Sequence, residues 1–144
     1  MKYTLDTSVL IRAMRDAAFN VALPTGMRDH GPRLFMHQVA LTELLAGARD
    51  PDRRALWHQR WQAPAEVVGR LVVPDAGAWD LASTVIATLR GEGKLTSVSP
   101  GFLNDCLIAS SCFREGITLV TDNARDAARA ARVLRGFEYI EGLP

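Results

Sequence analysis

The chain has 144 residues, of which 48% are hydrophobic and 23% are charged, and its formal net charge is +1. This balance excludes a largely disordered chain and is typical of a globular protein, so we expect a single domain over residues 1–144. The near-neutral charge does not by itself indicate a nucleic acid or membrane partner. No apolar run is long enough to span a membrane and no signal peptide is evident, so we expect a cytoplasmic protein.

Short apolar runs alternate with helical patterns along the chain. The runs are rich in β-branched and aromatic residues, as expected for strands buried on both faces. They are Lys2–Leu5, Leu34–His37, Leu71–Val73, Ile117–Val120 and Phe137–Ile140.

Helical periodicity covers Val39–Arg49, Asp52–Trp61, Ala76–Arg90, Leu103–Glu115 and Ala124–Arg135, and residues 20–33 form a predicted loop. The alternation predicts an α/β fold with right-handed crossovers. Its mostly parallel sheet has about five strands and is covered by helices on both sides.

Four acidic residues occupy positions that a solvent-exposed charge does not explain. Asp6 directly follows the first predicted strand and Asp122 follows the fourth, where an open parallel sheet binds its ligands. Glu43 and Asp105 lie on predicted helix faces that carry small or apolar residues, where a lone carboxylate is costly to bury. Several carboxylates that converge there also repel one another, and a divalent cation relieves both problems.

The composition of this acidic set favours one class of metal. Carboxylates without a matching Cys or His cluster suit Mg²⁺ or Mn²⁺ and do not suit zinc. Such ions polarise phosphoryl oxygens and activate water. The residues therefore predict a metal site with Asp6 as its first ligand, and with Thr7 and Ser8 as the cap of the next helix or as supports of the ligands.

The segments "YTLDTSVLI", "VALTELLAGA", "NDCLIASSC" and "TLVTDNARD" resemble, in this order, the motifs of PIN-domain ribonucleases, in particular the VapC-type toxins of type II toxin–antitoxin systems. The resemblance covers nearly the whole chain. It implies a three-layer α/β/α fold in which Asp6, Glu43, Asp105 and a fourth acid surround Mg²⁺ or Mn²⁺. It also implies an endoribonuclease that cleaves RNA phosphodiesters by metal-activated water, forms a homodimer and is inhibited by a cognate VapB-like, DNA-binding antitoxin.

The identity of the fourth acid stays open. We favour Asp122, because it directly follows Thr121 and is the first acid beyond the strand. The family often has an acid or Asn two residues after this Thr and a further Asp three residues later, and these positions are Asn123 and Asp126 here. Both remain alternative ligands or supports, as do Asn104 and Thr121 as supports.

Each acid also has a plainer explanation. Asp6 suits a helix N-cap, Glu43 a solvated helix position, Asp105 the positive end of its helix, and Asp122 an Asx turn. Two other functions stay open as well. One is another Mg²⁺-dependent phosphohydrolase, whose chemistry calls for an acid where this chain has Ser8, and the other is a non-catalytic PIN module that acts through protein binding.

Two groups of arginines allow two interpretations. They either bind RNA phosphates or form solvent-exposed helix faces. One group is Arg49, Arg53, Arg54 and Arg60, and the other is Arg125, Arg129, Arg132 and Arg135.

Overall fold

The computed structural model describes residues 1–19 and 33–142, so the predicted loop over 20–33 lies outside the described residues except for Arg33. One five-stranded sheet has the strand order β3-β2-β1-β4-β5, and all four strand pairs are parallel. The parallel sheet predicted from the sequence is thereby confirmed. The strands are β1 (Lys2–Leu5), β2 (Leu34–His37), β3 (Leu71–Val72), β4 (Ile117–Thr121) and β5 (Tyr139–Glu141).

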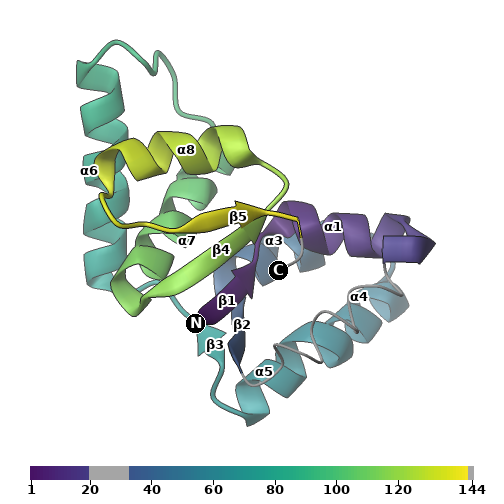
Figure 1. Ribbon diagram of the computed structural model, residues 1–144. Coiled ribbons are helices and arrows are strands. Elements are labelled where there is room, and N and C mark those ends of the chain that lie inside the picture. Colours follow the sequence, from purple (N-terminus) through teal and green to yellow (C-terminus); the bar gives the residue numbers. More distant parts are fainter. Residues whose placement is uncertain (20–32, 143–144) are drawn as a thin grey trace.

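Helices cover both faces of this sheet. All five residues of β4 are buried although successive side chains of a strand point to opposite faces, which requires a layer on each side. In Figure 1, α6, α7 and α8 gather at one end of the molecule, and α1, α3 and α4 lie at the other. The helices are α1 (Thr7–Arg15), α3 (Gln38–Ala46), α4 (Pro51–Trp57), α5 (Ala63–Val67), α6 (Ala76–Gly91), α7 (Pro100–Glu115) and α8 (Ala124–Val133).

Many element boundaries differ from the prediction by one to three residues, and three of the differences have a clear local reason. The helix predicted over Asp52–Trp61 instead runs from α4 through a π-helical turn, η2 (His58–Gln62), into α5, and this turn buries Trp61. Helix α7 begins before the predicted start because the Ser99 hydroxyl accepts a hydrogen bond from the backbone N–H of Phe102. Strand β5 begins after Phe137, whose backbone N–H donates to the carbonyl of Leu134 in the turn that follows α8.

The two central strands fix the position of the first acidic residue. Strand β1 pairs with β4 from Lys2 opposite Ile117 to Leu5 opposite Val120, and the backbone N–H of Asp6 continues the ladder by donating to the carbonyl of Val120 at 2.9 Å. The chain builds outward from β1 through β2 to β3 on one side, and from β4 to β5 on the other. The junction of β1 and β4 is therefore the topological switch point, where open α/β sheets bind ligands.

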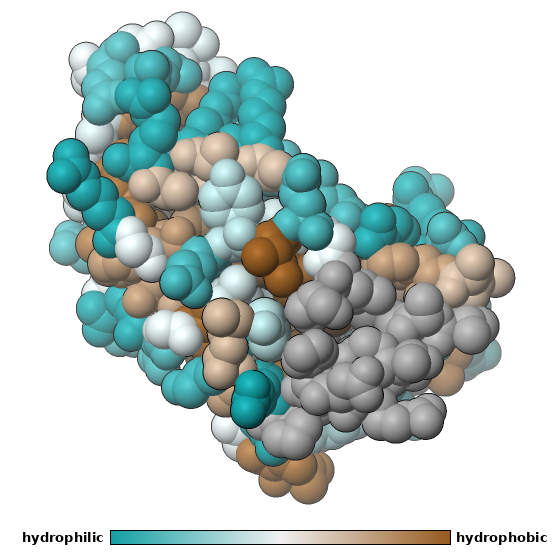
Figure 2. All heavy atoms as spheres, in the orientation of Figure 1, coloured by the Kyte–Doolittle hydropathy of each residue, from teal (hydrophilic) through white to brown (hydrophobic). Residues whose placement is uncertain are grey.

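The surface is mainly hydrophilic on the face that Figure 2 shows, with a hydrophobic patch at the lower tip of the molecule near the end of α5. Val67 and Val68, at this end of α5, are 86% and 58% exposed. Within residues 1–19 and 33–142, no helix combines the length and apolar character that crossing a bilayer demands.

The end of α7 provides a test of backbone strain. Gly116 caps this helix with φ +61°, and a Cβ placed there meets nothing within 4 Å, so replacement by Ala costs backbone strain alone. We expect Gly116→Ala to lower the free energy of unfolding by about 1 kcal/mol in urea denaturation. Gly91→Ala is the matched control, because Gly91 ends α6 in equally open space without a positive φ. Equal losses in both variants would contradict this explanation.

A carboxylate cluster as the candidate active site

Asp6 is held between the start of α1 and the end of β4. Its side chain is 5% exposed, and one oxygen, Oδ1, accepts a hydrogen bond from the backbone N–H of Thr7 at 2.7 Å. The other oxygen, Oδ2, accepts from the hydroxyls of Thr121 at 2.6 Å and Ser8 at 3.0 Å. Burial raises the pKa of Asp6, these hydrogen bonds partly oppose the rise, and the charge of Glu43 adds to it. The helix-cap explanation thus accounts for one oxygen only, and the second oxygen belongs to the β1–β4 junction.

Glu43 joins three helices at this junction. Its Oε2 accepts a hydrogen bond from the Thr7 hydroxyl of α1 at 2.5 Å, and its Oε1 accepts from the Asn104 amide of α7 at 2.8 Å. Thr7 and Asn104 therefore orient a carboxylate that α3 carries. The interpretation of Glu43 as a solvated helix residue does not agree with these two contacts.

Asp105 faces residues at the start of α8. The Asn123 amide donates to Asp126 at 2.9 Å and lies 3.4 Å from Asp105, and Asp126 also pairs with Arg129 at 3.0 Å. The pKa of Asp105 is raised to about 7 by burial, by the negative charges of Asp6, Asp126 and Glu43, and by a hydrogen bond with Asp126. We call Asp6, Glu43, Asp105 and Asp126 the acid cluster.

Asp122 lies apart from the acid cluster. Its carboxylate forms an ion pair with the Arg12 Nε at 3.2 Å, and Arg12 also stacks on the Phe19 ring with its guanidinium carbon 3.7 Å from the ring centroid. The backbone N–H of Asp122 donates to the Ser8 hydroxyl at 3.1 Å. The role of Asp122 as the fourth acid stays a prediction, and this geometry favours Asn123 and Asp126 for that place.

Three further side chains support the site; the sequence patterns did not single out Arg12 or His37, and they marked Arg129 only as a possible phosphate contact or solvent-exposed residue. Arg12 and Arg129 each neutralise one acid of the β4–α8 segment. His37 caps α3 by accepting from the backbone N–H of Val39 at 3.2 Å, and burial lowers its pKa to about 4, so it is neutral near pH 7. An i, i+3 spacing signals the Arg129–Asp126 pair in the sequence, whereas no local signal links Arg12 to Asp122.

The donor chemistry of the acid cluster fits a hard divalent cation, since its side chains offer carboxylate oxygens together with the Asn123 amide oxygen. Within the described part of the chain, no three His, Cys, Asp or Glu side chains are already gathered as a ready-made metal site. Mg²⁺ does not require such a cage, because it usually binds through one or two carboxylates and keeps several waters. Burial raises the pKa values of Asp6 and Asp105, and the charges of neighbouring carboxylates add to the rise; a cation bound here would offset both effects.

Because the pKa of Asp105 is raised, we expect the free energy of unfolding in metal-free buffer to depend on pH. Its folded-state pKa of about 7 exceeds the usual value, so its contribution to stability is complete in acid and is lost as the pH rises through 7. We expect Asp105→Asn to raise the free energy of unfolding at pH 8 by the order of 1–2 kcal/mol, after allowance for partial exposure, and to change it little at pH 4. Denaturant titrations with EDTA at both pH values measure this difference.

Asp122→Asn is the matched control, because Asp122 is paired with Arg12 outside the cluster. We expect no gain in stability from it at pH 8. A similar gain in both variants would show that repulsion within the acid cluster is not the cause.

The comparisons with known proteins agree with this architecture. A family model of the PIN domain matches residues 3–133. No curated protein matches the sequence. A chain of DNA-bound VapBC from Salmonella typhimurium has a TM-score of 0.71 at 20% identity, with 98% of both chains covered.

Two further solved structures share the fold at low sequence identity. A chain of VapBC2 from Rickettsia felis, bound to a promoter DNA fragment, has a TM-score of 0.67 at 18% identity, with 99% of both chains covered. A chain of FitAcB from Neisseria gonorrhoeae has a TM-score of 0.68 at 15% identity, with 96% of both covered. The resemblance read from the four sequence motifs is confirmed by the family match over most of the chain, and this protein belongs to the PIN-domain family.

Proposed function

We propose that this protein is a VapC-type endoribonuclease that cleaves RNA phosphodiesters with the help of Mg²⁺ or Mn²⁺. The observation that carries the proposal is the convergence of Asp6, Glu43 and Asp105 at the β1–β4 junction of a PIN fold, together with the raised pKa values of Asp6 and Asp105. Four motifs that lie far apart in the sequence thus contribute to one site, which their separate explanations as caps and turns do not account for.

The roles of the residues follow from their hydrogen bonds. A divalent cation bound here would supply positive charge for the phosphate and lower the pKa of a water molecule. Thr121, Ser8 and Thr7 hold both oxygens of Asp6 in place, and Thr7 and Asn104 hold those of Glu43. Asp105 carries a proton near neutral pH, which it must release when a cation binds, so cation binding strengthens as the pH rises.

We propose Asp126, with Asn123 beside it, as the acid from the β4–α8 segment that completes the site. Asp126 raises the pKa of Asp105 and is hydrogen-bonded to Asn123, whereas Asp122 is not among the groups that raise this pKa. Both acids have an arginine partner, so ion pairing does not distinguish them, and the choice rests on the proximity of Asp126 to Asp105. This choice revises our preference from the sequence, where the first acid after the strand was favoured.

The contacts of Ser8 argue against the phosphatase alternative. Ser8 stands where such an enzyme has a second acid, and its hydroxyl donates to Asp6 and accepts from the backbone N–H of Asp122. Both contacts are structural. The non-catalytic alternative does not explain why the carboxylates of the acid cluster are retained and oriented by hydrogen-bond donors.

We further propose a cognate VapB-like, DNA-binding antitoxin and a homodimeric toxin. Support for the antitoxin comes from the assemblies in which the similar folds were solved, namely VapBC and FitAB complexes with DNA. The homodimer is proposed from the resemblance of the sequence motifs to VapC-type toxins. An antitoxin that inhibits this chain would need to cover the acid cluster.

Cleavage of RNA by the purified protein tests the proposed activity. We expect cleavage of a labelled single-stranded RNA with Mg²⁺ or Mn²⁺, its loss in EDTA and its return with added Mn²⁺. Asp6→Asn should reduce the rate by roughly 100-fold or more, because this carboxylate lies at the centre of the cluster. Full activity of Asp6→Asn, or hydrolysis of a phosphate monoester in place of RNA, would overturn the proposal.

The fourth acid is tested by a matched pair of variants. Asp126→Asn and Asp122→Asn each remove one negative charge from the same short segment. We expect Asp126→Asn to lower the cleavage rate by about tenfold or more and Asp122→Asn to change it by less than about threefold. If circular dichroism shows that both variants are folded and Asp122→Asn causes the larger loss of cleavage rate, then Asp122 is the fourth acid and our choice of Asp126 is wrong.

A further inference from the structure

A groove of about 460 Å³ adjoins the acid cluster on the side of α1, α3, α4 and η2. Three arginines from three elements line it, namely Arg15, Arg53 and Arg60, and Glu43 lines it as well. We call this feature the arginine groove. Glu43 belongs to both, so the arginine groove lies next to the acid cluster.

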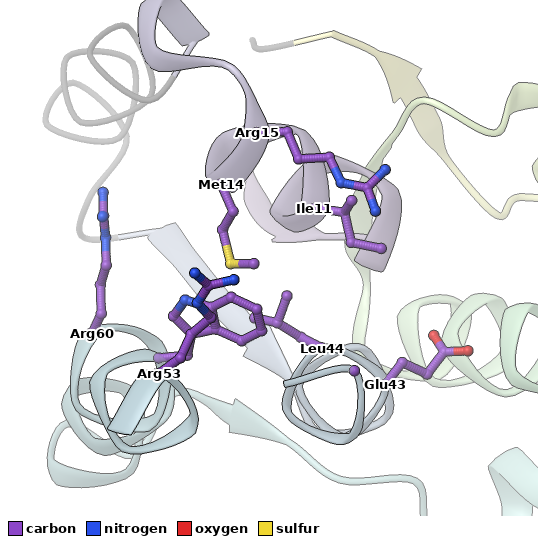
Figure 3. A pocket seen from close by; sticks show the side chains of 9 residues that line it. Ile11, Met14, Arg15, Glu43, Leu44, Arg53 and Arg60 are labelled. Atoms are coloured by element: carbon purple, nitrogen blue, oxygen red, sulfur yellow. The ribbon is translucent and has the colours of Figure 1, made fainter. Parts of the chain in front are cut away.

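The two arginines that α1 and α4 contribute to the groove have no acidic partner among the described residues. Arg15 and Arg53 are exposed and form no ion pair with any described acid, while Arg60 lies over the Trp61 ring, 5.1 Å from its centroid. Glu43 is the one acid among the described lining residues, and its oxygens are bonded to Thr7 and Asn104. Figure 3 shows its carboxylate pointing away from Arg53 and Arg60.

Part of the groove lining, which we call its floor, is apolar. It comprises Ile11 and Met14 of α1, Leu44 of α3 and Trp57 of α4. An apolar and aromatic floor with a basic rim is the arrangement that binds single-stranded nucleic acid, since bases stack on rings while phosphates contact arginine. A peptide would satisfy the floor equally well, but Arg15 and Arg53, which form no ion pair with a described acid, favour a polyanion.

We propose that the arginine groove binds the single-stranded RNA segment next to the cleaved phosphodiester, with phosphates on Arg15 and Arg53 and a base against Trp57. This inference rests on the proposed ribonuclease function, because it takes the acid cluster as the place of cleavage. The groove then contributes to RNA affinity and to KM, and the acid cluster determines the chemical step.

Binding of RNA in the absence of cleavage tests the groove directly. We would titrate a fluorescent single-stranded RNA with Asp6→Asn protein in Mn²⁺ at several salt concentrations. The titration is then repeated with a variant that carries Arg15→Gln and Arg53→Gln in addition to Asp6→Asn. Loss of two phosphate contacts should reduce the slope of log K against log[salt] by about 1.4. It should also weaken binding at 0.1 M salt on the order of tenfold.

The matched control replaces two exposed arginines that do not line the groove. Arg54 follows Arg53 on α4 and Arg90 lies at the far end of α6, so Arg54→Gln with Arg90→Gln removes the same charge. We expect this control to keep the parent slope and affinity. Equal losses in both double variants, or no loss in the groove variant, would overturn the inference.

Two further outcomes separate this inference from the proposed function. If the groove variant binds RNA normally but loses affinity for a purified protein partner, the groove is a peptide site and the inference fails. If the wild-type chain binds RNA through the groove but never cleaves it, the proposed function fails, and only the binding of RNA by the groove stands. If the variant with both Arg15→Gln and Arg53→Gln cleaves RNA with an unchanged KM, the inference about the groove fails and the proposed ribonuclease function is unaffected.

Discussion

Repulsion among carboxylates at the β1–β4 junction is the constraint on which the rest of the site depends. Asp6 is nearly inaccessible to solvent, and burial together with Glu43 raises its pKa. Asp105 responds by holding a proton near neutral pH. A fold that keeps such a cluster gives up stability in the metal-free state, and a divalent cation would restore it by neutralising the excess charge.

The surroundings of the acid cluster are built to donate hydrogen bonds. The donors are short side chains and a backbone amide at the ends of secondary-structure elements, where they reach a carboxylate without a flexible linker. They belong to the first turn of α1, to the end of β4 and to the start of α8, and include Thr7, Ser8, Thr121 and Asn123. Because β4 is buried on both faces, these ends have little freedom to move, which preorganises the carboxylates.

The two acids that follow β4, Asp122 and Asp126, form ion pairs with arginines from different helices. Arg12 from α1 neutralises Asp122, and Arg129 from α8 holds Asp126 beside Asp105. The acid cluster therefore has a negative centre, and the neighbouring arginine groove carries Arg15 and Arg53, which have no acidic partner among the described residues. The arginines of the groove would attract a negatively charged strand, and the carboxylates of the acid cluster would repel it. A cation bound at the cluster would remove this repulsion.

The sequence by itself determined the parallel α/β sheet, the alternation of strands and helices along the chain and the position of Asp6 after β1, because apolar periodicity and strand-end acids are local patterns. The order of the strands within the sheet came from the structure. The sequence also marked Glu43 and Asp105 as unusual for their helix faces. Only the tertiary structure decided that Asp122 pairs with Arg12, that Asp126 faces Asp105, and that the arginine groove joins the cluster at Glu43. The physical reason is that charge pairing depends on distances between elements as much as 110 residues apart in the chain, and no local pattern encodes those distances.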